Sequence, residues 1–141
     1  PLAMAAGMAT LDVMQREAVH ETLETLGARM QSGVEAILAR HALPVQFVRQ
    51  GSVFWFHFGV GERPRTAAGI GDDVPPIYAK FFHHCMEQGV YLAPSAYEVG
   101  FLSAAHTEED VDLALGVFDS ALPAAFAGGV GATETSGGLD A

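Results

Sequence analysis

The sequence predicts an α+β domain in which a small, mostly antiparallel sheet of three or four strands is covered on one side by helices. Two patterns support this prediction. Apolar residues recur at helical spacing before residue 41 and after residue 107, whereas residues 45–58 alternate as paired strands do. Half of the residues are hydrophobic and 17% are charged. This composition is typical of a globular domain with a buried core.

The first forty residues predict two helices. Residues 1–16 begin with Pro1, which suits a first helical turn, and they repeat methionine and leucine at helical spacing. They are also rich in alanine, so we expect this helix to pack on a large surface outside the chain. Residues 18–40 form the second helix, in which Gly27 and Gly33 each cost roughly 1 kcal/mol relative to alanine. Tertiary packing must therefore hold it. Its apolar stripe consists of Val19, Leu23, Leu26, Met30, Val34, Ile37 and Leu38.

Two strands and a long loop follow. Residues 45–49 and 52–58 alternate at period two and are separated by a bend at Gln50-Gly51. The second strand has apolar side chains on both faces, which predicts a central strand in a covered sheet. Residues 59–76 are rich in glycine, proline, arginine and aspartate, and they predict a long surface loop.

The second half of the chain predicts helix, two short strands and a final helix. Residues 77–88 form the helix, and residues 90–92 and 100–103 form the strands on either side of a turn. Thr107 is then the expected N-cap of the last helix, with Asp110 three residues later completing an approximate capping box.

Charge and composition exclude several classes of function. The formal net charge is −10, from 17 acidic and 7 basic side chains, so we expect no binding to nucleic acid or to an anionic membrane surface. No apolar run is long enough to span a membrane, and residues 1–4 show no basic region before an apolar stretch, so no secretory signal is visible in this sequence. The chain does not begin with methionine, which favours a truncated or processed product. A single cysteine, Cys85, fits a reducing cytoplasm.

Other reactive residues and glycine-rich segments do not form a recognisable site. His83, His84 and Cys85 are adjacent on a predicted helix, so they point in different directions and we expect no metal site. The thiol lies on the apolar side, where cysteine is usually inert. Residues 69–71 and 128–131 are glycine-rich but lack the strand–turn–helix setting of a phosphate-binding loop.

Residues 89–107 contain one isolated carboxylate. Glu98 lies in a stretch without other charged side chains, between the two short predicted strands. Taken by itself, this spacing favours an exposed turn residue. An active-site carboxylate is the alternative.

The same segment resembles the C-terminal signature of glutamate-1-semialdehyde 2,1-aminomutases, in which the pattern GVYLAPSxFExGFxSxAHTxED is typical. Tyr97 stands where phenylalanine is usual, a change that conserves shape. Residues 1–11 are similar to the helix that follows a Gly-Asn-Pro turn in these enzymes, and residues 51–54 resemble their Gly-Ser-hydrophobic-Phe strand, although Trp55 is bulkier than expected. The resemblance runs in order from residue 1 to about residue 125.

This resemblance implies a fold-type I pyridoxal-phosphate enzyme that converts glutamate 1-semialdehyde to 5-aminolevulinate for tetrapyrrole and porphyrin biosynthesis. The family's Schiff-base lysine, pyridine-nitrogen aspartate and phosphate-binding residues would lie upstream of Pro1. The only lysine here, Lys80, matches no family motif. We therefore expect the full-length parent to bind pyridoxal 5'-phosphate and this chain alone to bind none covalently and to be inactive.

The resemblance also implies how the chain is organised. Residues 1–17 would be a helix leading from the missing N-terminal large domain, residues 18–126 the small C-terminal domain, and residues 127–141 a disordered tail. The parent would be a homodimer. Glu98 matches the family glutamate at the active-site mouth, which implies an electrostatic and positional role and not that of the proton-transfer base.

Two alternatives remain at this stage. The first is the small domain of another class III aminotransferase, such as an ω-amino acid transaminase, which shares fold and cofactor but transfers nitrogen to a second substrate. The second is a free-standing binding module derived from such a domain. The sequence upstream of Pro1 distinguishes these alternatives.

Overall fold

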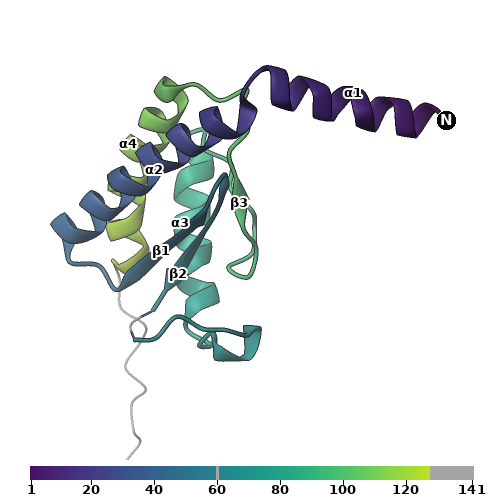
Figure 1. The fold of residues 1–141 in the computed structure, drawn as a ribbon. Coiled ribbons are helices and arrows are strands. Elements are labelled where there is room, and N and C mark those ends of the chain that lie inside the picture. Colours follow the sequence, from purple (N-terminus) through teal and green to yellow (C-terminus); the bar gives the residue numbers. More distant parts are fainter. Residues whose placement is uncertain (60, 128–141) are drawn as a thin grey trace, which may run out of the picture.

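The computed structural model describes residues 1–59 and 61–127 as four α-helices, one 3₁₀ turn and three strands. Figure 1 shows three of the helices gathered against a small sheet, while α1 projects away from the rest. The predicted α+β class is confirmed. The elements are α1 (Leu2–Arg16), α2 (Val19–His41), β1 (Val45–Gln50), β2 (Val53–Phe58), η1 (Ala67–Gly69), α3 (Val74–Glu87), β3 (Gly100–Phe101) and α4 (Glu108–Phe126).

The sheet is antiparallel throughout, in the order β1-β2-β3. β1 and β2 form a hairpin in which Gln50 pairs with Val53. Gly51 lies in this turn at φ +57°, a left-handed conformation that favours glycine. β3 pairs along only two residues, and Gly100 is needed there because a Cβ would collide with the ring of Phe54. The predicted central position of the second strand is confirmed.

The core lies between the β1–β2 hairpin and helices α2, α3 and α4. The Phe56 ring on β2 packs on Phe81 of α3 and Phe118 of α4, with centroid distances of 5.1 and 5.4 Å. Phe58, Phe81 and Phe118 are almost completely buried. Aromatic rings of this size dominate the hydrophobic contribution to stability, so this cluster fixes where the helices sit on the sheet.

Both glycines of α2 lie where another element approaches closely. A Cβ on Gly27 would lie 2.7 Å from the carbonyl oxygen of Gly51, and one on Gly33 would collide with the side chain of Leu115 on α4. The two glycines therefore lower the intrinsic stability of the helix but allow its neighbours to pack closely on it, as expected from its sequence.

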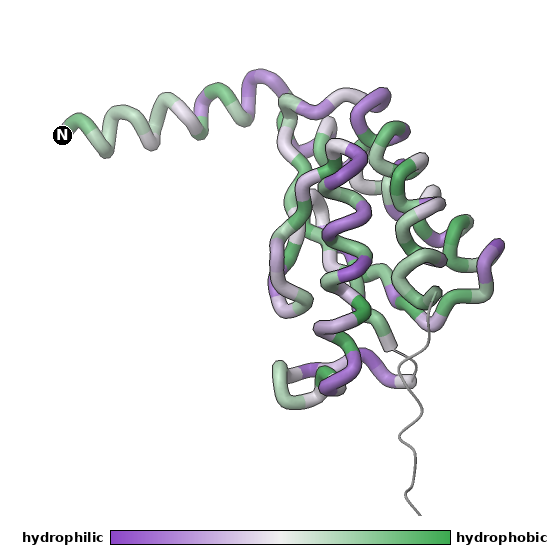
Figure 2. The backbone as a smooth tube through the Cα atoms, turned by 180° about the vertical axis from the view of Figure 1, so that it is seen from behind, coloured by the Kyte–Doolittle hydropathy of each residue, from purple (hydrophilic) through white to green (hydrophobic). Residues whose placement is uncertain are grey.

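Helix α1 contains no buried residue. Figure 2 shows hydrophobic residues along much of its length, although the helix contacts the rest of the molecule only near its C-terminal end. Leu2 and Met4 are 85% and 72% exposed. The division of the chain into a leading helix and a small domain stays a prediction.

Three predicted boundaries were wrong. Residues 90–92 form no strand, because the chain there continues from the end of α3: the N–H of Val90 donates to the carbonyl of Cys85 at 2.9 Å, next to Gly89 at φ +86°. β3 is shorter than residues 100–103. Helix α3 begins at Val74, because Pro75 and Pro76 occupy its first turn, where their missing N–H groups cost no intrahelical hydrogen bond.

Two other expectations concern the C-terminal tail and membrane-spanning helices. The tail predicted over residues 127–141 lies outside the described residues from position 128 onward. Within residues 1–59 and 61–127, no helix has both the length and the apolar character needed to cross a membrane.

Candidate functional site

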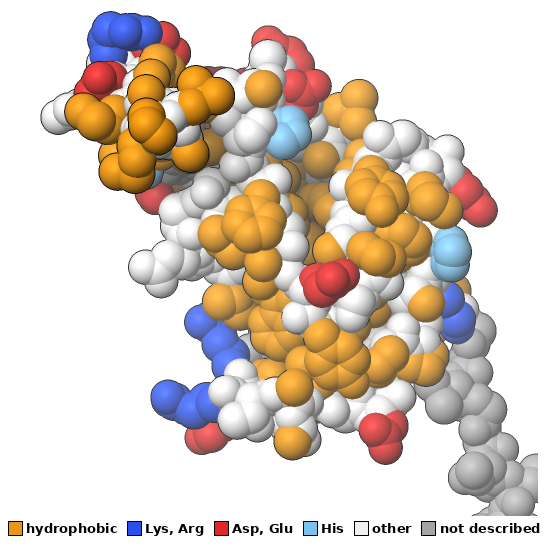
Figure 3. All heavy atoms as spheres, turned by 90° about the vertical axis from the view of Figure 1, so that its right-hand side faces the viewer, with side chains coloured by type: hydrophobic (Ala, Val, Ile, Leu, Met, Phe, Trp, Pro, Cys, Tyr) orange, Lys and Arg blue, Asp and Glu red, His pale blue; other side chains and the backbone are white. Residues whose placement is uncertain are grey.

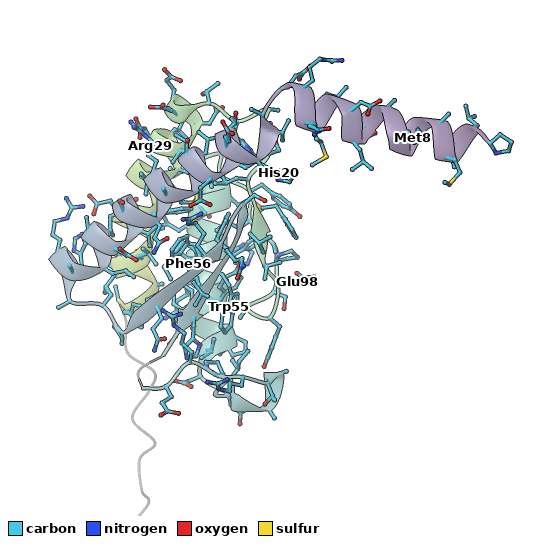
Figure 4. All side chains as sticks on the ribbon, viewed as in Figure 1. Met8, His20, Arg29, Trp55, Phe56 and Glu98 are labelled. Atoms are coloured by element: carbon cyan, nitrogen blue, oxygen red, sulfur yellow. The ribbon has the colours of Figure 1, made fainter. Side chains whose placement is uncertain are left out.

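Glu98 lies on an exposed turn just before β3. The turn is closed by hydrogen bonds from the N–H of Glu98 to the carbonyl of Ser95 at 3.1 Å and from the N–H of Tyr97 to Oγ of Ser95 at 3.2 Å. Figure 4 shows Glu98 at the outer edge of the domain, on the side toward which α1 projects. Within the part of the chain that the structure describes, the Glu98 carboxylate has no ion pair or side-chain hydrogen bond.

Two aromatic side chains, one buried and one partly buried, hold this turn in place. Tyr78 on α3 donates its hydroxyl to the carbonyl of Ala93 at 2.6 Å, and Trp55 on β2 donates Nε1 to the carbonyl of Ala96 at 2.8 Å. The turn is thus tied to a helix on one side and to the central strand on the other. Such support positions a functional side chain more exactly than a loose loop does.

The environment of Tyr78 makes its hydroxyl a hydrogen-bond donor and not a proton acceptor. Burial raises the pKa of Tyr78 to about 12, and the negative charge of Glu98 acts in the same direction. The phenol therefore stays protonated near neutral pH and keeps its hydrogen bond to the turn.

Glu98 lines two adjoining hollows on the surface. The first is a narrow one of about 10 Å³ beside Trp55 and Tyr78. The second is a wide, open one of about 460 Å³, whose lining residues are Ala93, Pro94, Tyr97, Glu98, Val99 and Phe101. Figure 3 shows the face of the molecule on this side, where hydrophobic side chains gather across the middle and most acidic groups lie around the margin.

The apolar side chains around Glu98 are unusually exposed. Tyr97, Val99 and Phe101 are 50%, 41% and 65% exposed. Contiguous exposed apolar surface of this kind commonly marks a face that another surface covers. When water is excluded from such a face, a carboxylate within it interacts more strongly with an opposite charge.

The hollows beside Glu98 do not by themselves fit pyridoxal phosphate. They contain apolar and aromatic side chains and one carboxylate, but no lysine, and no arginine to bind a phosphate. Lys80 is exposed on α3 and lines neither hollow. A cofactor of this type would need residues from outside these two hollows.

The other reactive residues identified in the sequence lie elsewhere. Cys85 is fully buried in the core, and burial raises its pKa to about 12, so it remains an unreactive thiol. His84 contacts the hydroxyl of Ser120 at 3.2 Å. Among the described residues, no three histidine, cysteine, aspartate or glutamate side chains come together to hold a metal ion.

Sequence reasoning missed the two anchors of the turn. Trp55 stood out only for its size, and Tyr78 not at all. Both signals were present in principle, because a buried indole N–H or phenol usually finds a hydrogen-bond partner. What the sequence did not indicate was that the partners would be carbonyls of the Glu98 turn.

We compared the chain with known proteins by sequence and by structure. No protein-family model matches the chain. Curated relatives named glutamate-1-semialdehyde 2,1-aminomutase are 38% to 43% identical to it. The relative from Akkermansia muciniphila is 43% identical over 112 residues, which are 79% of this chain and 26% of that protein. The chain thus spans about a quarter of the length of the curated relatives it matches.

Solved structures share the fold of this chain over about a quarter of their own length. An ω-transaminase from Sphaerobacter thermophilus matches with a TM-score of 0.66 and 25% identity, over 75% of this chain and 24% of that one. The FumI protein of Sphingopyxis sp. MTA144, solved in its PLP internal aldimine form, matches with a TM-score of 0.67 and 31% identity, over 86% of this chain and 26% of that one.

Sequence and fold therefore point to the same group of proteins. In sequence the chain is similar to the glutamate-1-semialdehyde 2,1-aminomutases, and in fold it is similar to a part of solved transaminases, in each case over about a quarter of their length.

Proposed function

We propose that this chain is the C-terminal part of an aminomutase that converts glutamate 1-semialdehyde to 5-aminolevulinate, the precursor of tetrapyrroles. The observation that supports this proposal is the 43% identity to an enzyme of that name. Four curated relatives of that name are 38% to 43% identical, and this sequence match favours the aminomutase reaction, because the shared architecture alone does not determine the reaction.

The catalytic centre would be completed by a large domain that this chain lacks. Pyridoxal phosphate, when bound, serves as the electron sink for reactions at the amine-bearing carbon. The hollows beside Glu98 do not fit that cofactor, so we assign its binding to the N-terminal large domain of the parent. The chain alone is then inactive. We further propose that the parent is a homodimer.

Glu98 would act at the mouth of the assembled active site. Its carboxylate is exposed in the chain, and the surrounding apolar surface would be covered once the large domain is present. Excluding water would strengthen the attraction between this carboxylate and an ammonium group on the substrate. We assign Glu98 an electrostatic and positional role and no proton transfer.

A hybrid enzyme tests this function. The chain would replace the matching segment of the Akkermansia muciniphila aminomutase, and the product would be assayed for 5-aminolevulinate from glutamate 1-semialdehyde without added amino donor or acceptor. Formation of 5-aminolevulinate under these conditions is the expected result. Turnover that requires a separate amino donor and acceptor would instead assign the chain to a transaminase.

Cofactor content and melting temperature of the hybrid serve as the control for folding. A hybrid that binds the cofactor and melts cooperatively but performs neither reaction would contradict the proposed function.

A further inference from the structure

A third hollow lies next to the Glu98 turn, on the loop between β2 and α3. It has a volume of about 240 Å³, and Arg65 is its only charged lining residue. Trp55 and Tyr97 form aromatic parts of its wall. The remaining lining residues are Pro64, Thr66, Ala67 and Ile70.

The hollow adjoins the Glu98 site through shared residues. Trp55 also lines the narrow hollow beside Glu98, and Tyr97 also lines the wide one. Glu98 follows Tyr97 in the chain. The three hollows therefore share walls formed by Trp55 and Tyr97, and Glu98 lines two of them whereas Arg65 lines the third.

Arg65 differs from most other arginines of the chain in having no acidic partner. Four of the six arginines form ion pairs, for example Arg49 with Glu24 at 2.8 Å and Arg29 with Asp112 at 2.7 Å. Within the described residues, Arg63 and Arg65 form none, although the chain carries a net charge of −10. Arg65 alone of these two lines the hollow.

The loop that carries Arg65 is braced at several points. The Gln46 side chain on β1 donates to the carbonyl of Gly61 at 2.8 Å. Pro64 packs closely on Gly69, because a Cβ built on Gly69 would lie 3.1 Å from the Cβ of Pro64. The 3₁₀ turn that follows Arg65 is closed by the N–H of Gly69 donating to the carbonyl of Thr66 at 3.0 Å. A fixed backbone reduces the entropic cost of binding at this place.

We propose that Arg65 and the Trp55–Tyr97 wall form a subsite for the carboxylate of the small-molecule substrate. A guanidinium presents paired N–H donors that match a carboxylate, and the aromatic rings offer contact to a short aliphatic chain. Locally, this arginine offsets the negative charge of the chain, which would otherwise repel an anionic substrate. The inference rests on the proposed function, in which the substrate is an amino-aldehyde with a distal carboxylate.

Trp55 provides a direct probe, because it is the only tryptophan in the sequence. Its fluorescence in the 141-residue chain would be titrated with levulinate, a five-carbon carboxylate without an amine. We expect a saturable change whose dissociation constant rises about tenfold or more in Arg65→Gln and is unchanged in the matched control Arg63→Gln. Inorganic phosphate should produce a weaker response, because it has no aliphatic chain to contact the rings.

The hybrid enzyme supplies the second measurement. Arg65→Gln should raise KM for glutamate 1-semialdehyde about tenfold or more with little change in kcat, the pattern of lost ground-state binding. Arg63→Gln should leave both constants unchanged. If a folded hybrid that binds the cofactor forms no 5-aminolevulinate, the proposed function fails, and the fluorescence titration still decides the subsite. No saturable levulinate response, an equal effect of both arginine variants, or tighter binding of phosphate would overturn the subsite.

Discussion

The indole Nε1 of Trp55 lies 2.8 Å from the carbonyl oxygen of Ala96 and donates a hydrogen bond to it. This contact joins the central strand to the turn that carries Glu98. Ala96 is itself 3% exposed, so the turn is part of the packed domain on one side and open to solvent on the other. The position of the carboxylate thus depends on a side chain 43 residues earlier in the chain.

Removing this hydrogen bond should destabilise the domain measurably. Trp55→Phe keeps an aromatic ring but leaves the Ala96 carbonyl without its donor, so we expect the free energy of unfolding to fall by about 1–2 kcal/mol. Urea denaturation followed by circular dichroism measures this. Tyr97→Phe, which removes an exposed hydroxyl from the same turn, should change stability by less than about 0.5 kcal/mol. Equal midpoints for the two variants would show that the indole contact contributes nothing.

His57 predicts a pH dependence of stability. The ring is 5% exposed, stacks on Trp55, and has no hydrogen-bond partner for Nδ1 among the described residues. Burial lowers the pKa of His57 in the folded state, while the charge of Asp73 opposes the shift. The unfolded chain therefore binds a proton more readily, and stability should decline as the pH falls below about 6.5.

The variant His57→Phe removes this proton-binding site and an unsatisfied buried nitrogen together. It should flatten the decline between about pH 7 and pH 5 without lowering stability at pH 7.5. Urea midpoints across this pH range provide the test. A parallel decline in both proteins would exclude His57 as its source.

The glycines of the first two helices should respond in opposite directions to alanine. Gly27→Ala places a Cβ 2.7 Å from a backbone carbonyl, and we expect a loss of about 1–3 kcal/mol despite better helix propensity. Gly7→Ala meets nothing within 4 Å and should leave stability unchanged or raise it. Thermal melts of both variants give the comparison. A Gly27→Ala protein as stable as the unmodified chain would mean that α2 and the hairpin are not in close contact.

The isolated chain should retain no pyridoxal phosphate. The hollows around Glu98 contain no lysine, so the cofactor added to the purified chain should be lost on desalting, together with its visible absorbance. The hybrid enzyme, treated in the same way, should keep it. A stoichiometric covalent adduct on the chain that disappears in Lys80→Ala would contradict this expectation.

Much of the fold could be predicted because its signals are local. The alternation over residues 52–58 identified the central strand, and the capping box before α4 is present, with the Asp110 N–H donating to Oγ1 of Thr107 and the Thr107 N–H donating to Asp110 at 2.8 Å. The missed boundaries were also local in origin. Val90 was assigned to a strand by its residue type, whereas its N–H is used to end α3.

The site was less accessible to prediction, because its supports are distant in sequence. Glu98 could be placed on an exposed turn from its neighbours, and its role came from a family resemblance. The hydrogen bonds from Trp55 and Tyr78 are accepted by backbone carbonyls 41 and 15 residues away. Because every residue has a backbone carbonyl, the amino-acid sequence does not indicate which one is the acceptor. For the same reason, no sequence pattern indicated that Arg65 would line the same hollow as Trp55 and Tyr97.

The most direct test of the account is the variant Glu98→Gln in the hybrid enzyme, which keeps the shape of the side chain and removes its charge. The predicted result is a fall in kcat of about tenfold or more, equivalent to roughly 1.4 kcal/mol, with cofactor content unchanged and the melting temperature within about 2 °C. Unaltered kinetics would place Glu98 outside the active site. A large loss of stability with full activity in the remaining folded enzyme would make it a structural residue, and either result would contradict the central claim.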